Sequence, residues 1–162
     1  MPELTENQRE SLEWIISIFA KYKIPYQISG GLAAKIYGST RPLNDIDIDI
    51  PEEGIAKILD DVKEYITYGP IRHLDEKWDV YLVALERNGQ EFDISAAESA
   101  KVHDDEADTW IAIPTDPTQG NWIEYSGMKL SVTPREELIA YKRYLNGDHQ
   151  QEDIRAIGGN GL

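Results

Sequence analysis

The sequence predicts an α/β (α+β) domain with a mixed, mostly antiparallel sheet, flanking helices and a pair of helices at the end of the chain. Residues 45–50 alternate Asp-Ile-Asp-Ile-Asp-Ile, which is the period of a strand with one apolar face. An Asn-Gly dipeptide at 88–89 and a Ser-Gly dipeptide at 126–127 each separate two strand-like segments, as hairpin turns do. Apolar residues at helical spacing precede and follow this β-rich region. These patterns predict one sheet packed against amphipathic helices.

Length, composition and charge limit the kinds of protein that this chain can be. The 162 residues are enough for one domain with a buried core, and 41% hydrophobic with 28% charged residues is typical of globular proteins. The chain contains no cysteine, which excludes disulfides, thiolate metal sites and a cysteine nucleophile. A net charge of −14 opposes contact with a phosphate backbone, so we do not expect a nucleic-acid partner. The polar, acidic N-terminal segment and the lack of a long apolar run predict a cytoplasmic protein without membrane contact.

The first half of the chain is expected to alternate helices with short strands. Thr5 and Gln8 have the spacing of a capping box. The helix that they begin should end near Lys23, because Pro25 disfavours helix at the residue before it. The remaining elements of this half are predicted as a strand at 26–29, a turn at Gly30-Gly31, a helix at 32–37, a loop at 38–44, a strand at 45–50 and a helix from Pro51 to about residue 65.

The second half is expected to contain the two hairpins and the terminal helices. The N-terminal signal of the first terminal helix is Thr133 as N-cap, Pro134 at the first helical position and Glu136 as capping-box partner. The predicted elements are hairpins at 78–87 with 91–95 and at 122–125 with 128–132, a loop or irregular helix at 98–108, helices at 134–145 and about 151–157, and a frayed tail at 158–161. We expect a single domain overall, in which residues 1–132 form the core and residues 133–162 contribute helices packed on it.

Asp45 and Asp47 are two residues apart on the predicted strand, so their carboxylates point to one face. Such neighbours repel each other, and a divalent cation would remove the conflict, because Mg²⁺ prefers oxygen ligands and commonly uses one or two carboxylates with substrate phosphates. The alternative is a half-buried strand whose outer face is simply acidic. A calcium loop of the EF-hand type is excluded, because its sixth and twelfth positions require Gly and Glu and here hold Ile50 and Ala56.

Two further features belong with these aspartates. Gly30-Gly31 follows a predicted strand and opens a helix, so its backbone amides are available to a phosphate group. Asp93 lies in the strand after the Asn-Gly turn, and its carboxylate completes a set of three if that strand lies beside residues 45–50. Three carboxylates suit two-metal phosphoryl or nucleotidyl transfer, in which the ions hold a triphosphate and assist an acceptor hydroxyl. This interpretation requires the three carboxylates to converge.

The combination of these motifs resembles a known superfamily. Residues 28–48 are Ile-Ser-Gly-Gly-Leu-Ala-Ala-Lys-Ile-Tyr-Gly-Ser-Thr-Arg-Pro-Leu-Asn-Asp-Ile-Asp-Ile. This stretch resembles the signature of the DNA polymerase β-like nucleotidyltransferase superfamily, and in particular its small members with a G-G-x-A…G…R…D-h-D-h core, where h is apolar. Those members include lincosamide and aminoglycoside nucleotidyltransferases and the AbiEii-type toxins. The resemblance covers residues 24–95 and continues more weakly into the last helices.

The resemblance implies a nucleotidyltransferase fold and an enzyme that moves an NMP from an NTP to an acceptor hydroxyl with the help of Mg²⁺ or Mn²⁺. It implies that Asp45, Asp47 and Asp93 are catalytic metal ligands, with Asp93 also placed as the base on the acceptor hydroxyl. Gly30 and Gly31 would hold the triphosphate through their backbone amides.

Arg41 and Lys142 are implied as further phosphate contacts. Arg41 is also compatible with a solvated loop position or with an internal partner for an aspartate, and Lys142 with an ordinary surface position. Asp49 departs from the pattern, because the family more often has an apolar or small residue there. His73 and the other histidines lack metal-ligand spacing and are expected to be surface or core residues.

The acceptor and the activity are left open by the sequence. A small, antibiotic-like molecule is the expected acceptor. The alternatives are a toxin-type nucleotidyltransferase that acts on a tRNA or a protein, and an inactive nucleotide-binding or interaction module of the same fold. The presence of all three aspartates favours an active enzyme.

Overall fold

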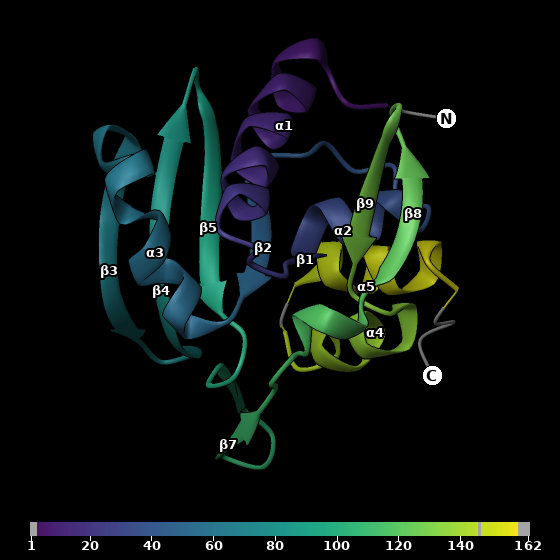
Figure 1. The fold of residues 1–162 in the computed structure, drawn as a ribbon. Helices are drawn as coiled ribbons and strands as arrows, with labels where there is room; N and C mark the ends of the chain where they lie inside the picture. The colour runs from purple at the N-terminus through teal and green to yellow at the C-terminus, as the bar shows by residue number, and fades with distance from the viewer. Residues whose placement is uncertain (1–2, 146, 159–162) are drawn as a thin grey trace.

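The computed structural model of the chain describes residues 3–145 and 147–158. In these residues a nine-stranded sheet carries helices on both of its faces (Figure 1). The strands are β1 (Gln27–Ser29), β2 (Ile46–Ile50), β3 (Ile66–Leu74), β4 (Trp78–Arg87), β5 (Gln90–Ala96), β6 (Lys101–Asp104), β7 (Thr109–Ala112), β8 (Asn121–Tyr125) and β9 (Met128–Val132). The helices are α1 (Glu6–Lys21), α2 (Gly30–Ile36), α3 (Glu52–Val62), α4 (Arg135–Lys142) and α5 (Asp148–Ala156), with 3₁₀ turns η1 (Lys63–Tyr65) and η2 (Pro117–Gln119).

The sheet has the order β7-β6-β4-β5-β2-β1-β9-β8, and β3 also pairs with β4. The pairs β1–β9 and β2–β5 are parallel, whereas the hairpins and the β1–β2 pair are antiparallel. The mixed, mostly antiparallel sheet that the sequence predicted is therefore confirmed. Two registers position the site, because Ser29 of β1 and Asp93 of β5 both lie opposite Asp47 of β2.

The larger part of the core lies between the sheet and the helices α1 and α3, and it continues among α2, α4 and α5. Ile46, Ile48 and Ile50 of β2 are completely buried on this side, as the alternating pattern predicted. Complete burial of such a side chain contributes about 1.5–3 kcal/mol. The helix α1 begins at the predicted capping box, in which Thr5 and Gln8 exchange both hydrogen bonds. Figure 1 shows α1 and α3 in front of β2, β5 and β4, so the Asp side chains that alternate with the isoleucines must point to the opposite face.

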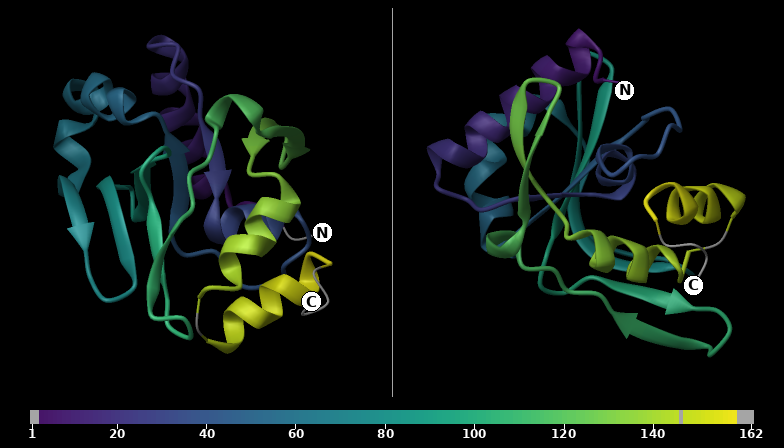
Figure 2. Two further views of the ribbon diagram at one scale, coloured as in Figure 1. Left: turned by 90° about the horizontal axis from the view of Figure 1, so that it is seen from below. Right: turned by 90° about the vertical axis from the view of Figure 1, so that its right-hand side faces the viewer.

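The opposite face of the sheet is only partly covered. The helices α4 and α5 pack against each other and against α2, which follows β1. In the right-hand view of Figure 2, these helices lie across the sheet from α1 and α3, and the β6–β7 hairpin extends beneath α4. Residues of the aspartate face, of α4 and of β7 line one cavity on this side of the sheet.

Two β elements differ from the prediction. Residues 98–108, expected to be a loop or an irregular helix, include β6 and the turn into β7, and the two strands pair from Lys101–Ala112 to Asp104–Thr109. No strand was expected at 66–74, where β3 pairs with β4 through an irregular register. Pro70 interrupts the β pattern of that segment, and a proline is tolerated in a strand chiefly at a sheet edge or a bulge.

The C-terminal helices also differ from the prediction in their ends. Thr133 is not the N-cap of α4, because Pro134 occupies that position without a side-chain cap. The Thr133 hydroxyl instead donates a hydrogen bond to the Ile28 carbonyl oxygen at 2.8 Å, which ties the end of β9 to β1. The helix α5 begins at Asp148, earlier than expected. Most of the tail predicted at 158–161 lies outside the described residues.

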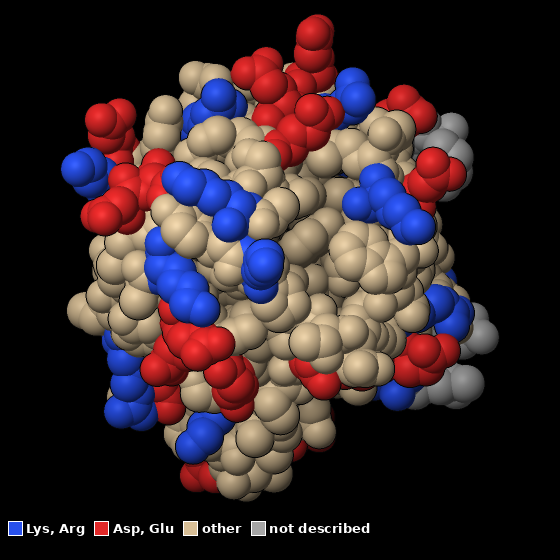
Figure 3. All heavy atoms as spheres, in the orientation of Figure 1, with Lys and Arg blue, Asp and Glu red and all other residues tan. Residues whose placement is uncertain are grey.

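The surface over α1 and α3 is a mixture of charges. Acidic and basic side chains are interspersed on this face (Figure 3). No helix in the described ranges has the length and apolar character that crossing a membrane requires.

Candidate active site

The strands β2 and β5 bring the predicted carboxylates to one cavity. Because these strands are parallel and in register, Asp47 and Asp93 lie side by side on the face opposite the core. Asp45 precedes β2 and Asp49 follows Asp47 by two residues, so the acidic side chains form a row along one strand edge. Asp45, Asp47, Asp49 and Asp93 all line a cavity of about 750 Å³, a volume in the range of small-molecule sites.

Burial and mutual repulsion raise the pKa values of these acids. Burial, followed by the negative charges of Asp93, Asp49 and Asp45, raises the pKa of Asp47 to about 8. Burial raises the pKa of Asp49 to about 7, although a hydrogen bond from the Thr115 hydroxyl at 3.1 Å opposes the shift. The pKa of Asp93 is raised by burial and then by Asp45. The cavity floor therefore holds carboxyl groups that resist simultaneous ionisation, which is a common property of functional sites.

The three predicted metal ligands, Asp45, Asp47 and Asp93, do not converge on one point. The Asp45 carboxyl is hydrogen-bonded to Glu91 at the start of β5, and this contact raises the pKa of Glu91. Within residues 3–145 and 147–158, no group of three or more His, Asp or Glu side chains is arranged to hold one metal ion. Asp47 and Asp93 are brought together, and Asp45 lines the same cavity while it contacts Glu91.

The Gly30-Gly31 turn passes directly over Asp47. Gly30 has a positive φ of +58°, and a Cβ atom at this position would lie 2.0 Å from Asp47 Oδ2. A side chain at Gly30 is therefore disfavoured by the backbone conformation and, more strongly, by contact with Asp47. At Gly31 a Cβ atom would meet only Leu43, at 3.9 Å. The Gly30 amide donates a hydrogen bond to the Tyr141 hydroxyl, and burial raises the pKa of that phenol.

Arg41 and Lys142 share one buried carboxylate. Arg41 donates two hydrogen bonds to Asp153, at 2.8 and 2.7 Å, and Lys142 Nζ lies 3.1 Å from Asp153 Oδ2. Burial alone would raise the pKa of Asp153, but the hydrogen bonds from Arg41, Ser39 and Lys142 lower it to about 2. The surface position that we considered for Lys142 is wrong, because its side chain is 3% exposed. Lys142 also lowers the pKa of Asp47, which shows that its charge reaches the carboxylate row.

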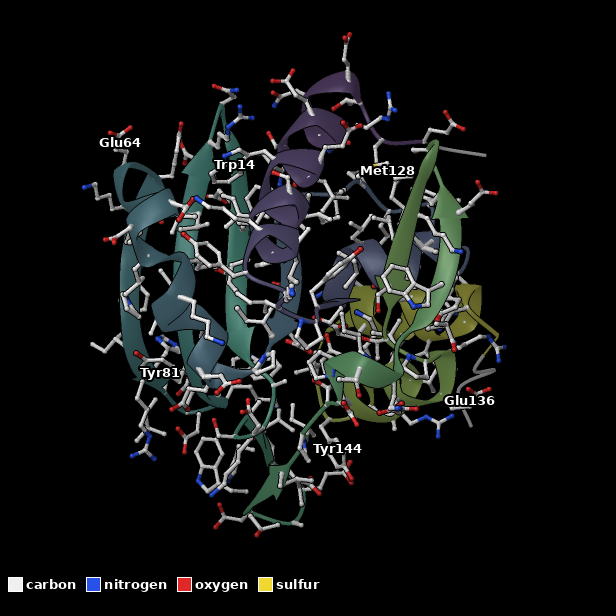
Figure 4. The ribbon with its side chains drawn as sticks, in the orientation of Figure 1. Trp14, Glu64, Tyr81, Met128, Glu136 and Tyr144 are labelled. Atoms are coloured by element: carbon white, nitrogen blue, oxygen red, sulfur yellow. The ribbon has the colours of Figure 1, made fainter. Side chains whose placement is uncertain are left out.

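Aromatic and aliphatic residues outside the sequence motifs form the walls of the cavity. Trp78, Val80 and Leu82 of β4 line one side, and Tyr141 and Tyr144 of the α4 region line the other. The Trp78 and Tyr141 rings approach to 6.4 Å between centroids. Tyr144 lies between α4 and β7 in the view of Figure 4. The strand alternation of β4 could have indicated this wall, since both of its faces are apolar.

His73 also lines the cavity, although its sequence context indicated no role. Its Nε2 lies 2.8 Å from Asp75 and its Nδ1 lies 3.1 Å from the Tyr68 hydroxyl. It lies close enough to Asp93 to lower the pKa of that carboxyl. Only the position of β3, which was not predicted, brings His73 to this cavity.

The sheet carries paired aspartates on two parallel strands, beside a Gly-Gly turn, as expected of a nucleotidyltransferase. The comparison with protein families gives the same class: the model of the aminoglycoside-2''-adenylyltransferase family matches residues 11–157. The chain therefore belongs to the aminoglycoside-2''-adenylyltransferase family and is an enzyme of the nucleotidyltransferase class. No curated protein sequence matches the chain.

Solved structures share the fold at low sequence identity. A Thermotoga maritima protein assigned as a nucleotidyltransferase has 23% identity and a TM-score of 0.64, with 87% of each chain covered. The lincosamide antibiotic adenylyltransferase LnuA, bound to lincomycin, has 16% identity and a TM-score of 0.61 over 96% of this chain and 98% of its own. ANT(2'')-Ia in complex with adenylyl-2''-tobramycin has 18% identity and a TM-score of 0.60 over 95% and 91%. These likenesses support the nucleotidyltransferase fold.

Proposed function

We propose that this protein transfers an NMP from an NTP to a hydroxyl group of a small molecule, with release of pyrophosphate and with Mg²⁺ or Mn²⁺ as the metal. The observation that carries the proposal is the register of β2 and β5, which brings Asp47 and Asp93 together on the floor of a cavity large enough for a small molecule. The membership of an adenylyltransferase family supports the same reaction.

The side chains divide into an acceptor side and a donor side. Asp93, on β5, would take the proton from the acceptor hydroxyl, because its raised pKa brings a carboxylate closer to the strength that a general base needs. Gly30 and Gly31, on the other side of β2, would hold the triphosphate through backbone amides. The Tyr141 hydroxyl now accepts the Gly30 amide hydrogen bond, so a phosphate oxygen would replace it there.

Arg41 and Lys142 would supply positive charge to the phosphates. Both now bind Asp153, so two positive side chains share one buried carboxylate. Lys142 lies close enough to influence Asp47, which supports a position within reach of the donor.

The residues fit a divalent cation by the chemistry of their donors. Asp45, Asp47 and Asp93 line one cavity without converging on one point, so Asp45 and Asp47 would hold the cation together with phosphate oxygens, and Asp93 would be the third carboxylate only after a side-chain rearrangement. Hard oxygen donors of this kind are the ligands that Mg²⁺ prefers. The contact between Asp45 and Glu91 and the raised pKa of Asp47 both indicate negative groups that a cation would stabilise. A bound cation would neutralise charge on the triphosphate and favour the ionised form of the acceptor hydroxyl.

A thermal unfolding series tests the donor site. Wild type is heated with each of ATP, CTP, GTP and UTP, with and without Mg²⁺, and Asp47→Asn is treated identically. A ligand at about 100 times its Kd adds roughly 2.7 kcal/mol of stability, which raises Tm by about 5–10 °C in a chain of this size. A rise that needs Mg²⁺, occurs with one or more nucleotides and is lost in Asp47→Asn is expected. No rise with any nucleotide would favour the alternative of an inactive interaction module.

Acceptors are tested by pyrophosphate release under the same conditions. Lincomycin, to which LnuA is bound, and tobramycin, whose adenylyl derivative is bound to ANT(2'')-Ia, are the first compounds to test. We expect nucleotide-dependent pyrophosphate release with a small hydroxyl-bearing acceptor and its loss in Asp93→Asn. Release that requires tRNA or a protein acceptor would contradict the small-molecule proposal.

A further inference from the structure

The chemistry of the cavity floor changes from strand to strand. On β2 the side chains toward the cavity are Asp45, Asp47 and Asp49, and on β5 they are Asp93 and Ser95. The next strand, β4, presents a different set consisting of Trp78, Val80, Leu82 and Ala84. Neighbouring strands lie about 4.8 Å apart, so an apolar strip runs alongside the proposed acceptor base.

The register fixes how close this strip comes to the reacting group. Ala84 lies directly opposite Asp93, and Leu82 lies opposite Ser95. A molecule whose hydroxyl contacts Asp93 must therefore place most of its body over β4, because the Gly30 turn and the Asp45–Asp47 part of β2 form the donor side, whereas Asp49 lies beyond them. The hydroxyl and the apolar contact are separated by only one strand spacing.

The apolar strip is a wall of the cavity and not an extension of the core. The alternate residues of β4, Tyr81, Val83 and Leu85, already pack into the core on the other face. Leu82 is only partly buried, and the side chains of Ile111 and Ile113 on the β6–β7 hairpin face the same cavity. Half-exposed aliphatic groups on two walls form a surface that gains free energy when an apolar group covers it, by about 25 cal/mol for each Å² removed from water.

The charged residues that line the cavity indicate which charge the acceptor molecule carries. No Lys or Arg side chain is among the described residues that line the cavity, whereas Asp49 and Glu137 remain after the three proposed metal ligands are assigned. Asp49 lies beyond Asp47 on the same strand edge, with its carboxylate held by Thr115. Anionic acceptors are therefore disfavoured, and a basic amine would find a carboxylate at Asp49 or at Glu137.

We infer that the acceptor is a small amphipathic amine, with an apolar body that lies on β4 and the β6–β7 hairpin, a hydroxyl at Asp93 and a basic nitrogen at Asp49 or Glu137. This inference rests on the proposed reaction and specifies its acceptor class. Polyamine sugars do not belong to this acceptor class, because they have no apolar group that would cover Leu82 and its neighbours.

Calorimetric titration with two probes tests the inference on the full chain. Lincomycin combines hydroxyl groups, one basic nitrogen and an apolar propyl chain, whereas tobramycin is a polyamine without an apolar arm. The titrations are run in about 0.5 M salt, so that general attraction of a polycation to this acidic protein is screened. We expect lincomycin to bind at least tenfold more tightly than tobramycin.

Variants on β4 and on its partner strand β3 test whether the apolar strip itself contacts the acceptor. Leu82→Gln should weaken lincomycin binding about tenfold, the low end of the effect of a changed contact in an apolar pocket. The matched control is Leu74→Gln on β3, because Leu74 is 57% exposed and does not line the cavity. Leu82→Ala, which keeps the strand apolar, replaces Leu82→Gln if circular dichroism shows that the glutamine variant is unfolded, and it should produce a smaller loss in the same direction.

Three results would overturn the inference: no binding of lincomycin, tighter binding of tobramycin, or equal losses in the Leu82 and Leu74 variants. The proposed reaction is checked separately by the Mg²⁺-dependent rise of Tm with nucleotide. If nucleotide stabilises the protein but lincomycin does not bind, the acceptor inference alone fails. If lincomycin binds as expected while no nucleotide stabilises the protein, the apolar acceptor surface stands and the proposed reaction fails.

Discussion

Replacing Asp47 by Asn should make the free protein more stable while removing its proposed catalytic site. In the unfolded chain Asp47 titrates near its ordinary pKa of 3.8, whereas in the fold burial and neighbouring acids raise this pKa to about 8. Between these values the unfolded chain releases the proton and the folded chain retains it. The free energy of unfolding therefore falls as the pH rises from about 4 to about 8 and becomes flat above that range.

The size of the effect follows from the difference between the two pKa values. A difference of roughly four units is worth up to about 6 kcal/mol at pH 8 or above, at 1.36 kcal/mol for each unit. Water entry and bound buffer cations reduce this ceiling, so we expect a gain of about 2 kcal/mol in Asp47→Asn, which raises Tm by about 4–8 °C. At pH 5 the gain should be much smaller, because the folded carboxyl is then already neutral.

The assay is urea unfolding followed by circular dichroism at several pH values, in buffer that contains EDTA. The control is Asp60→Asn on α3, an exposed acid whose replacement should change the unfolding free energy little at any pH. A gain in Asp47→Asn that does not depend on pH, or a loss of stability at pH 8, would refute the electrostatic account of the carboxylate row.

Three further predictions concern the turn, the ion network and the metal. Gly30→Ala should lower Tm by several degrees and abolish nucleotide binding, because the new methyl group would lie 2.0 Å from the neighbouring carboxylate oxygen, whereas Gly31→Ala should fold with nearly wild-type stability in a thermal scan. Asp153→Asn should cost about 3 kcal/mol in urea unfolding, because it leaves Arg41 and the buried Lys142 without their shared anion, and an unchanged midpoint would contradict this. Excess EDTA should abolish the nucleotide-dependent rise of Tm, and added Mg²⁺ should restore it.

The parts of the fold that depend on local pattern could be predicted from the sequence. The alternating residues 45–50 form β2, the capping box at Thr5 begins α1, and both turn dipeptides join the expected hairpins. The strand β3 could not be predicted, because Pro70 and the adjacent glycine break its pattern and its pairing with β4 is irregular. The short strands of the β6–β7 hairpin flank an acidic turn, and that composition resembles a loop.

The carboxylates that line the cavity could be predicted from the sequence, but their surroundings could not. Spacing alone shows that Asp45 and Asp47 share a face, and the motif order indicates that Asp93 joins them. The partner of Arg41 is 112 residues away in the chain, and no local signal identifies Asp153 as that partner. The burial of Lys142 depends on how α4 and α5 pack together, which also determines the cavity wall. Long-range packing thus decides which charges are free and which are already paired.

The balance of charge in the cavity suggests the order in which substrates bind. Four carboxyl groups of the β2 and β5 region line it, and the network around Asp153 sets two positive side chains, Arg41 and Lys142, against one buried carboxylate. A free triphosphate carries about four negative charges at neutral pH, so without a cation its approach to this floor is opposed by Coulomb repulsion.

Protons mask part of the negative charge in the free protein, since the pKa values of Asp47 and Asp49 are raised to about 8 and about 7. A divalent cation that displaces those protons would convert the repulsion into attraction, and its binding should therefore strengthen as the pH rises and release protons. On this argument the nucleotide enters together with its metal, and the apolar strip of β4, which needs neither, is available to the acceptor throughout.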